Sequence, residues 1–181
     1  SKFYNLTVNK TGNNYVRINN GDTIRVSNQL RINDNSAFML DDNGANVGHA
    51  IVNDLTVNGI LYLYGLSNFP TVINNSVTYD ASTGGLARVQ YYTNADQIVD
   101  SLVNGAYDLI LYNSNSTNFT YSLESDLRIN DDVIVGHDGT NEFTVLDIGN
   151  RNFTITDGIA VQTGDTLKGT GTLTHDLLAT E

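Results

Sequence analysis

The chain has 181 residues, of which 40% are hydrophobic and only 16% are charged, and its formal net charge is −11 with a pI near 4.3. A chain this acidic repels nucleic-acid phosphates and anionic lipid headgroups, so we expect no nucleic-acid partner and no direct membrane insertion. Divalent cations and neutral glycans fit the charge better. The chain has no cysteine, which excludes disulfide bonds and thiol chemistry.

Short strands are expected along the first half of the chain. Apolar residues recur two apart, as a strand with one buried face requires, and Asn, Asp and Gly form turns between the runs, for example at residues 19–22. The expected strands lie at residues 6–8, 15–18, 23–26, 30–32, 38–40, 50–52, 55–57 and 60–64.

The middle of the chain is less regular, and strands resume after it. Pro70, the single proline, precedes expected strands at 71–73 and 77–79, and residues 95–103 have the apolar spacing of a helical turn. Residues 167–173, near the end of the chain, are rich in Gly and Thr. The later expected strands lie at residues 107–112, 119–121, 127–129, 133–135, 143–148, 153–155 and 159–161.

One pattern occurs twice in the chain. An aromatic pair or tyrosine leads into a strand, and a later strand reads Leu-Arg-Ile-Asn-Asp, at residues 30–34 and again at 127–131. The gap from Leu6 to Leu30 is longer than the gap from Leu109 to Leu127, so the period is not strict. Self-similarity of this kind indicates stacked repeats. We therefore assign a weak repeat to residues 3–75 and 106–160, with an irregular middle at 76–105.

These observations predict an all-β fold, namely a right-handed parallel β-helix or β-solenoid, with a β-sandwich as the alternative. Asparagines at the coil corners are expected to hydrogen-bond along the stack. We expect residues 1–181 to form a single solenoid domain. Because Ser1 leads directly into the first strand, we interpret the chain as a segment excised from a longer repeat protein, which would pack against neighbouring repeats or copies of itself.

The order of short strand motifs resembles the β-solenoid repeats of very large secreted surface proteins and adhesins of Bacteroidetes, including those exported by the type IX system. The motifs are Tyr-x-Leu at 107–109, Leu-x-Val-x-Gly at 55–59 and Leu-Asp-x-Gly at 146–149. Phage tail proteins use similar motifs. The resemblance implies a non-enzymatic stalk or adhesive module that is extracellular or on a cell surface, with a virion tail fibre or tailspike as the alternative location. It carries no catalytic residues.

A polysaccharide lyase or hydrolase is the second alternative, because parallel β-helices also host pectin-cleaving enzymes that use clustered carboxylates. Asp131 and Asp132, followed by Gly-His-Asp-Gly at 136–139, superficially resemble the polygalacturonase motif. The further Asn-Thr-Asp and Arg-x-Lys elements of those enzymes are missing. We therefore interpret Asp131 and Asp132 as a turn, as Asp34 is in the first copy, and we assign no catalytic residue.

Calcium is the one cofactor that the sequence suggests. The acidic loops at 41–44 and 138–142 offer several oxygen ligands, and Asp41, Asp42, Asp138 and Glu142 are the candidate metal ligands. Neither loop has EF-hand spacing, and solvated acidic turns would look the same. The three histidines are far apart in sequence, which does not favour a transition-metal site.

Tyrosines are the candidate ligand-binding residues. Tyr62 and Tyr64 lie on one face of their expected strand, and Tyr91 and Tyr92 form an adjacent pair. Exposed aromatic rings on a β-surface can stack on sugar rings. The same rings could instead fill the solenoid core. A glycan or a cell or abiotic surface is therefore the partner that we predict.

Overall fold

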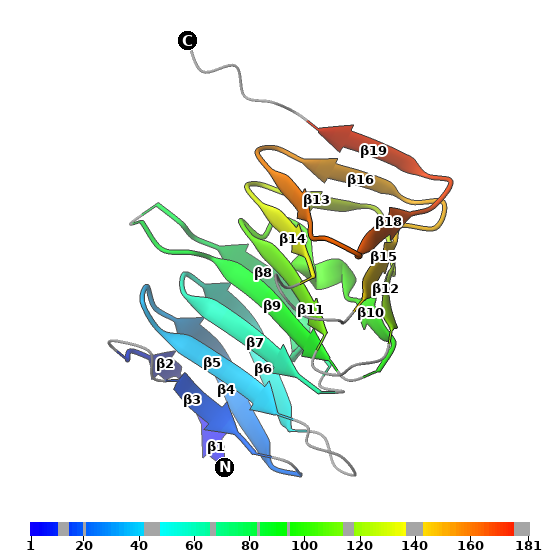
Figure 1. The fold of residues 1–181 in the computed structure, drawn as a ribbon. Helices are drawn as coiled ribbons and strands as arrows, with labels where there is room; N and C mark the ends of the chain where they lie inside the picture. Colours follow the sequence, from blue (N-terminus) through cyan, green and yellow to red (C-terminus); the bar gives the residue numbers. More distant parts are fainter. Residues whose placement is uncertain are drawn as a thin grey trace. The chain divides into compact units, whose positions relative to one another are not determined.

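The structure is a computed structural model that describes residues 1–10, 15–19, 21–41, 48–65, 68–82, 84–93, 95–113, 118–136 and 143–175. Among these residues the only helix is one short 3-10 turn, η1 (Ser101–Val103). All the rest of the regular structure is β-strand, and the strands stack in parallel sheets as a β-solenoid of about six turns (Figure 1). The all-β solenoid prediction is therefore confirmed. Of the stretch 95–103 that was expected to hold a helical turn, only Ser101–Val103 forms one, as η1, and Gln97–Val99 is strand β10.

The chain divides into two compact units, Ser1–Gln90 and Tyr91–Glu181, which are described separately. In the first unit, one sheet has the order β1–β4–β6–β8 with β2 also paired to β4, and β3, β5 and β7 form a second sheet. The division falls within β9 (Arg88–Thr93). The strands of the first unit are β1 (Lys2–Phe3), β2 (Leu6–Val8), β3 (Tyr15–Ile18), β4 (Thr23–Ile32), β5 (Ala37–Asp41), β6 (His49–Val57), β7 (Ile60–Tyr64) and β8 (Thr71–Tyr79).

Three parallel sheets make up the second unit, with the orders β10–β12–β15–β18, β11–β14–β17 and β13–β16–β19. The Gly- and Thr-rich end of the chain, for which the sequence suggested no strand, contributes β18 and β19. The strands are β10 (Gln97–Val99), β11 (Leu109–Asn113), β12 (Phe119–Leu123), β13 (Leu127–Ile129), β14 (Val133–Val135), β15 (Thr144–Asp147), β16 (Asn152–Ile155), β17 (Ile159–Val161), β18 (Thr166–Lys168) and β19 (Thr172–His175).

One coil takes nearly the same length of chain in both units. In the first unit Leu30 pairs with Leu6 on one side and with Leu55 on the other. In the second unit Val133 pairs with Leu109 and with Ile159. Partners on neighbouring coils are thus separated by a nearly constant number of residues, which is the length of one coil. Residues one coil length apart in the sequence therefore lie side by side.

The core lies between the sheets and is filled by alternate residues of each strand. In β5 and β7 the inward side chains are Phe38, Leu40, Leu61 and Leu63, each at most 1% exposed. Because the side chains of a strand alternate between its two faces, the residues between them point outward. The second unit is filled in the same way by buried residues of β11, β12, β14 and β16, namely Leu109, Leu111, Tyr121, Val133, Val135, Phe153 and Ile155.

The strand pairs expected at residues 23–26 and 30–32, at 50–52 and 55–57, and at 71–73 and 77–79, are each one continuous strand, β4, β6 and β8. This corrects the prediction of separate strands. β4 and β6 keep their pairing across a shift of register that falls between Val26 and Gln29, and β6 and β8 do so across a shift between Val52 and Asp54. A bulge of this kind bends a strand without ending its ladder. The polar residues between the first two expected strands, residues 27–29, thus form a corner within β4.

Asparagine side chains link successive coils at this corner, as predicted. Asn28 Nδ2 donates to Asn5 Oδ1 at 2.8 Å, and Asn53 Nδ2 in the next coil donates to the backbone oxygen of Ser27 at 2.8 Å. The amide has both donors and an acceptor, so one residue type can bond both upward and downward in the stack.

Replacing Asn5 by alanine is expected to lower the free energy of unfolding by about 0.5–1.5 kcal/mol, the usual net value of a hydrogen bond. The change removes the acceptor of Asn28 Nδ2 and a weaker contact from the Gln29 N–H at 3.4 Å. Denaturant titration measures the loss. Asn118→Ala, at an exposed asparagine of the second unit, is the control and should leave the midpoint unchanged. Equal midpoints for all three proteins would show that the corner bond contributes nothing.

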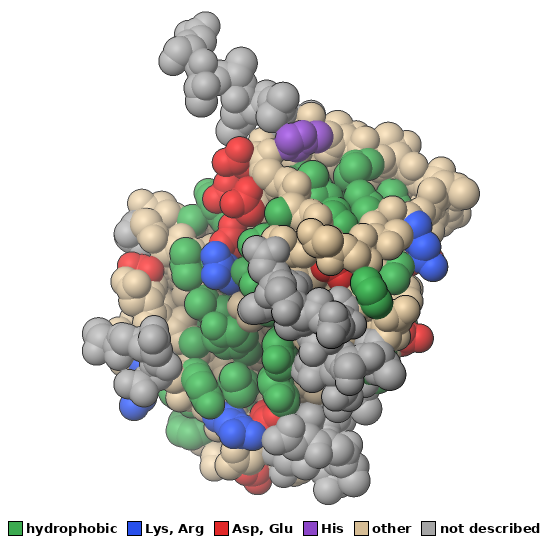
Figure 2. All heavy atoms as spheres, viewed as in Figure 1, with side chains coloured by type: hydrophobic (Ala, Val, Ile, Leu, Met, Phe, Trp, Pro, Cys, Tyr) green, Lys and Arg blue, Asp and Glu red, His purple; other side chains and the backbone are tan. Residues whose placement is uncertain are grey.

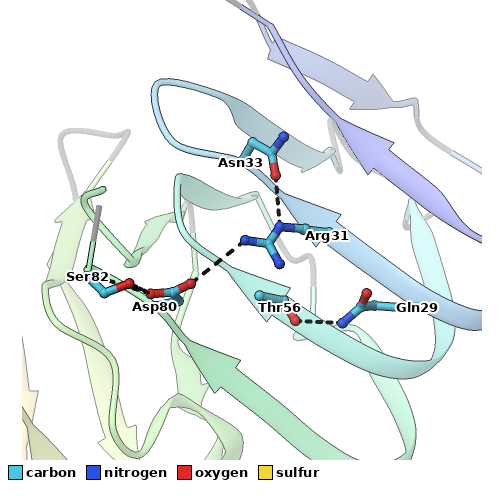
Figure 3. A network of polar contacts seen from close by, with 6 residues as sticks. All are labelled: Gln29, Arg31, Asn33, Thr56, Asp80 and Ser82. Atoms are coloured by element: carbon cyan, nitrogen blue, oxygen red, sulfur yellow. Dashed lines mark hydrogen bonds and ion pairs between the residues drawn. The ribbon is translucent and has the colours of Figure 1, made fainter. Parts of the chain in front are cut away.

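The repeated Leu-Arg-Ile-Asn motif has the same local structure in both units. Arg31 Nε donates to Asn33 Oδ1 at 2.9 Å, and Arg128 Nε donates to Asn130 Oδ1 at 3.2 Å. Figure 3 shows Arg31 between Asn33 and Asp80, whose Oδ2 lies 3.7 Å from Arg31 Nη2. The leucine and isoleucine of each copy are buried. The motif is therefore a real structural repeat.

The two copies of the longer repeat around this motif place their landmarks differently on the coils. In the first copy, Leu6 lies directly beside Leu30 on the adjacent coil. In the second copy, Leu109 pairs with Val133 and Leu127 pairs with Phe153, in two different sheets. The gap between the landmarks of the second copy is shorter than a coil, so these landmarks are two sides of one coil and do not stack.

Candidate functional site

The outward face of β3, β5 and β7 gathers tyrosine, arginine and aspartate side chains in the first unit. Arg17 of β3 pairs with Met39 of β5, and Asp41 at the end of β5 pairs with Tyr64 of β7. The inward neighbours of these residues are core leucines and phenylalanine, so the strand alternation holds the polar and aromatic side chains on the other face. Tyr62 lies on the same face, beside Met39.

Five of these outward side chains line a shallow pocket with a volume of about 210 Å³: Tyr15, Arg17, Met39, Asp41 and Tyr64. Figure 2 shows the face that carries it, with hydrophobic side chains gathered over β5 and β7. Tyr15 is 45% exposed, while Met39 and Tyr64 are half-buried. The pocket thus has aromatic and thioether walls and two charged groups.

Asp41 is the unusual member of this pocket, because only 1% of its surface is exposed. Its Oδ2 forms an ion pair with Nη2 of Arg17. Both carboxylate oxygens are buried and neither accepts a hydrogen bond from the described part of the chain, so Oδ1, which is outside the ion pair, has no partner there. Buried carboxylate oxygens are normally hydrogen-bonded, so an oxygen without a donor in a pocket has unused binding capacity.

Three of the four predicted tyrosines are placed where a ligand could reach them. Tyr62 and Tyr64 are half-buried on the outward face of β7, and Tyr92 is half-buried in the second unit, where its ring meets Tyr112 edge-on at 6.3 Å. Tyr91 is different, since its ring is buried and packs against Tyr121 at 5.8 Å. We therefore remove Tyr91 from the candidate ligand-binding residues.

Tyr91 serves the core of the second unit. Its hydroxyl oxygen accepts a hydrogen bond from the Asp100 N–H at 3.2 Å, next to the residue where η1 begins. Burial raises the pKa of Tyr91 well above the ordinary value, so the ring stays neutral at any physiological pH. The alternation of side chains along a strand explains why Tyr91 is buried and Tyr92 is not. The two residues are adjacent in β9, so one of them must point inward.

Of the four predicted calcium ligands, the structure describes only Asp41. Asp42, Asp138 and Glu142 lie outside the described residues. The charge of Asp41 is balanced by the guanidinium of Arg17. Asp41 therefore acts as an ion-pair partner in the structure.

A separate acidic cluster lies in the second unit, where Asp131, Asp132 and Asp157 bring carboxylate oxygens within 4.8 Å of one another. Asp131 and Asp132 form the turn between β13 and β14, as predicted from the sequence. The coil that follows adds Asp157, whose N–H donates to the backbone oxygen of Asp131 at 3.3 Å. Gly158 leaves room for the cluster, because a Cβ there would lie 2.4 Å from Asp132 Oδ1.

Burial, together with the charges of Asp108, Asp132 and Asp157, raises the pKa of Asp131 from the ordinary 3.8 to about 6. Close carboxylates oppose one another's ionisation, so the cluster retains a proton that isolated aspartates would lose. A carboxyl group that keeps its proton up to about pH 6, next to ionised ones, has the properties of a general acid in mildly acidic conditions. Oxygen ligands at this spacing also suit a hard cation such as calcium.

The cluster is expected to make the chain less stable as the pH rises from about 4 to 7. Asp131 has a folded pKa above its unfolded pKa, so its contribution is complete below pH 3.8 and is lost as the pH passes through about 6. Asp131→Asn removes this dependence. Unfolding free energies of wild type and variant, measured across this range, should therefore diverge in favour of the variant.

Asp126 provides the control of opposite sign for this pH experiment. The Asn152 N–H, at 2.9 Å from Asp126 Oδ1, lowers the pKa of that carboxyl group, which therefore stabilises the fold above pH 3.8 and loses this effect in acid. Asp126→Asn should become relatively less stable than wild type as the pH rises. Parallel pH curves for wild type and Asp131→Asn would contradict the raised pKa.

Sequence reasoning missed Asp157 and Asp108 as neighbours of Asp131 and Asp132. The sequence feature that could have revealed these neighbours is the coil length. It places β11, β14 and β17 side by side and pairs Val133 with Leu109 and Ile159. The segments that immediately precede these three strands therefore stack, and they carry Asp108, Asp132 and Asp157. Sequence reasoning also missed the pocket, because Tyr15, Asp41 and Tyr64 are far apart in the sequence. They lie together only because successive coils have nearly the same length.

Comparison of the chain with protein-family models, curated proteins and solved structures found no match in any of the three. In the described part of the chain, no helix has the length and apolar character needed to cross a membrane.

Proposed function

We propose that this chain is a non-enzymatic, extracellular β-solenoid module of a larger surface protein, and that it binds glycans through the outward face of β3, β5 and β7. The observation that carries the proposal is the pocket on that face, where Tyr15 and Tyr64 accompany Arg17 and Asp41. Tyrosine rings present an apolar surface with a polar rim, and they combine with hydrogen-bonding groups to hold sugars.

The solenoid itself supports an adhesive role. Within each unit, parallel ladders run from coil to coil, and coils stacked in this way form a stiff repeat structure. The motifs at 55–59 and 146–149 resemble those of Bacteroidetes surface adhesins. In a surface protein that carries several such modules, several weak contacts would together give strong attachment.

A glycan array tests the proposal. The purified chain is applied with calcium and again with a chelator, and we expect retention on a defined class of sugar. Tyr64→Ala should weaken binding about tenfold, which corresponds to about 1.4 kcal/mol, because one wall of the pocket is lost. Tyr4→Ala is the matched control, since Tyr4 is 71% exposed and does not line the pocket. No retention in either condition would favour a passive stalk.

A polysaccharide hydrolase is the second candidate, and one observation favours it. Three carboxylates lie within 4.8 Å, and one of them, Asp131, has a pKa of about 6. Glycoside hydrolysis needs such a proton donor next to an ionised carboxylate. Release of reducing ends from neutral and acidic polysaccharides tests this role. Activity that disappears in both Asp131→Asn and Asp132→Asn would support the hydrolase, and activity that persists would exclude these residues.

A further inference from the structure

We propose that the pocket on β3, β5 and β7 recognises a neutral pyranose, and that a sugar hydroxyl donates a hydrogen bond to Oδ1 of Asp41. This inference rests on the proposed glycan-binding function and names the ligand class for it. The ligand would contact the rings of Tyr15 and Tyr64, with Arg17 beside it.

The first argument is the unused oxygen of Asp41. Asp41 is one of the residues that line the pocket, and its Oδ1 is buried and accepts no hydrogen bond within the described part of the chain. A charged acceptor without a donor is costly to bury, and a donor that enters the pocket recovers that cost. Hydroxyl groups are small donors, and each pyranose carries several of them at different angles.

The second argument is charge balance. Arg17 and Asp41 form an ion pair, so the two charges of the pocket cancel. An anionic sugar would find a guanidinium that is already neutralised, in a chain of net charge −11. A cationic ligand would have to displace Arg17 from Asp41. A neutral ligand requires neither change and still finds donors on Arg17 and an acceptor on Asp41.

The third argument is the arrangement of the walls. Tyr15 is 45% exposed, and Tyr64 lies on β7, opposite Asp41 in the register. A lining that combines a carboxylate acceptor with aromatic rings matches a pyranose, which has polar hydroxyls at its edge and C–H groups on its faces.

Calorimetric titration of the purified chain with neutral and anionic oligosaccharides tests the inference. The probes are soluble β-glucan, mannan and galactan fragments against oligogalacturonate. We expect binding of a neutral probe, at least tenfold weaker binding of oligogalacturonate, and at least tenfold weaker binding of the neutral probe by Asp41→Asn. Tyr4→Ala should bind as wild type does.

The outcomes separate this inference from the proposed function. Binding lost in Tyr64→Ala but unchanged in Asp41→Asn, or a preference for oligogalacturonate, leaves glycan binding intact and overturns the inference. No binding of any probe overturns both. If Asp41→Asn does not fold, monodeoxy derivatives of the bound sugar replace it: loss of one hydroxyl should weaken binding to the wild type about tenfold, and an unchanged affinity across all of them overturns the inference.

Discussion

Replacing Phe38 by alanine is expected to lower the free energy of unfolding by about 3–5 kcal/mol, the usual cost of removing a buried phenylalanine ring. Phe38 is 0% exposed and lies in β5 between Val16 of β3 and Leu61 of β7. Its ring therefore lies in the interior of one coil, with a further coil on each side. Neighbouring side chains cannot close the gap, because the ladders on either side hold the strands in place.

Denaturant titration of Phe38→Ala measures this loss, and Ile73→Ala is the control. Ile73 is a large apolar residue of the same unit, in β8, but it is 61% exposed. Its truncation should change the free energy of unfolding by less than about 0.5 kcal/mol, as is usual at exposed positions. Equal losses for the two variants would contradict the burial pattern from which the outward face, and hence the pocket, is deduced.

Replacing Gly59 by alanine is expected to disrupt the first unit, with a loss of stability of more than about 3 kcal/mol, because overpacking of a rigid site routinely costs about 1–3 kcal/mol and here the obstacle is backbone. A Cβ at Gly59 would lie 2.2 Å from the backbone oxygen of Ser36 and 2.3 Å from that of Asn33. The Gly59 N–H also donates to the oxygen of Ile32 at 3.1 Å. Neither coil can move away without breaking this ladder.

Gly84→Ala separates this steric effect from ordinary glycine strain. Gly84 has a φ of +82°, but a Cβ there meets nothing within 4 Å. Alanine at Gly84 should therefore cost only about 1 kcal/mol, the penalty of a left-handed backbone conformation. Circular dichroism and denaturant midpoints compare the variants. A Gly59→Ala protein as stable as Gly84→Ala would mean that the coils are not in van der Waals contact at this corner.

Much of the strand content was visible in the sequence because a strand with one buried face alternates in polarity. Residues 60–64 were predicted as a strand, and β7 has these limits, with Leu61 and Leu63 inside. Corner asparagines were also predicted correctly, since Asn28 bonds Asn5 across the coils. The prediction failed at β4, β6 and β8, where an irregularity in register interrupts the alternation without ending the strand.

Short-range patterns in the chain specify the all-β solenoid, because alternating apolar residues, closely spaced turn residues and the repeated Leu-Arg-Ile-Asn motif all act between near neighbours in the sequence. Which distant residues meet depends on how the coils pack. Asp131 approaches Asp157, and Asp41 approaches Arg17 and Tyr64, because parallel coils place residues one coil length apart side by side. Coil length varies slightly from turn to turn, and a shift of one residue turns a side chain to the opposite face, so the register could come only from the packed coils.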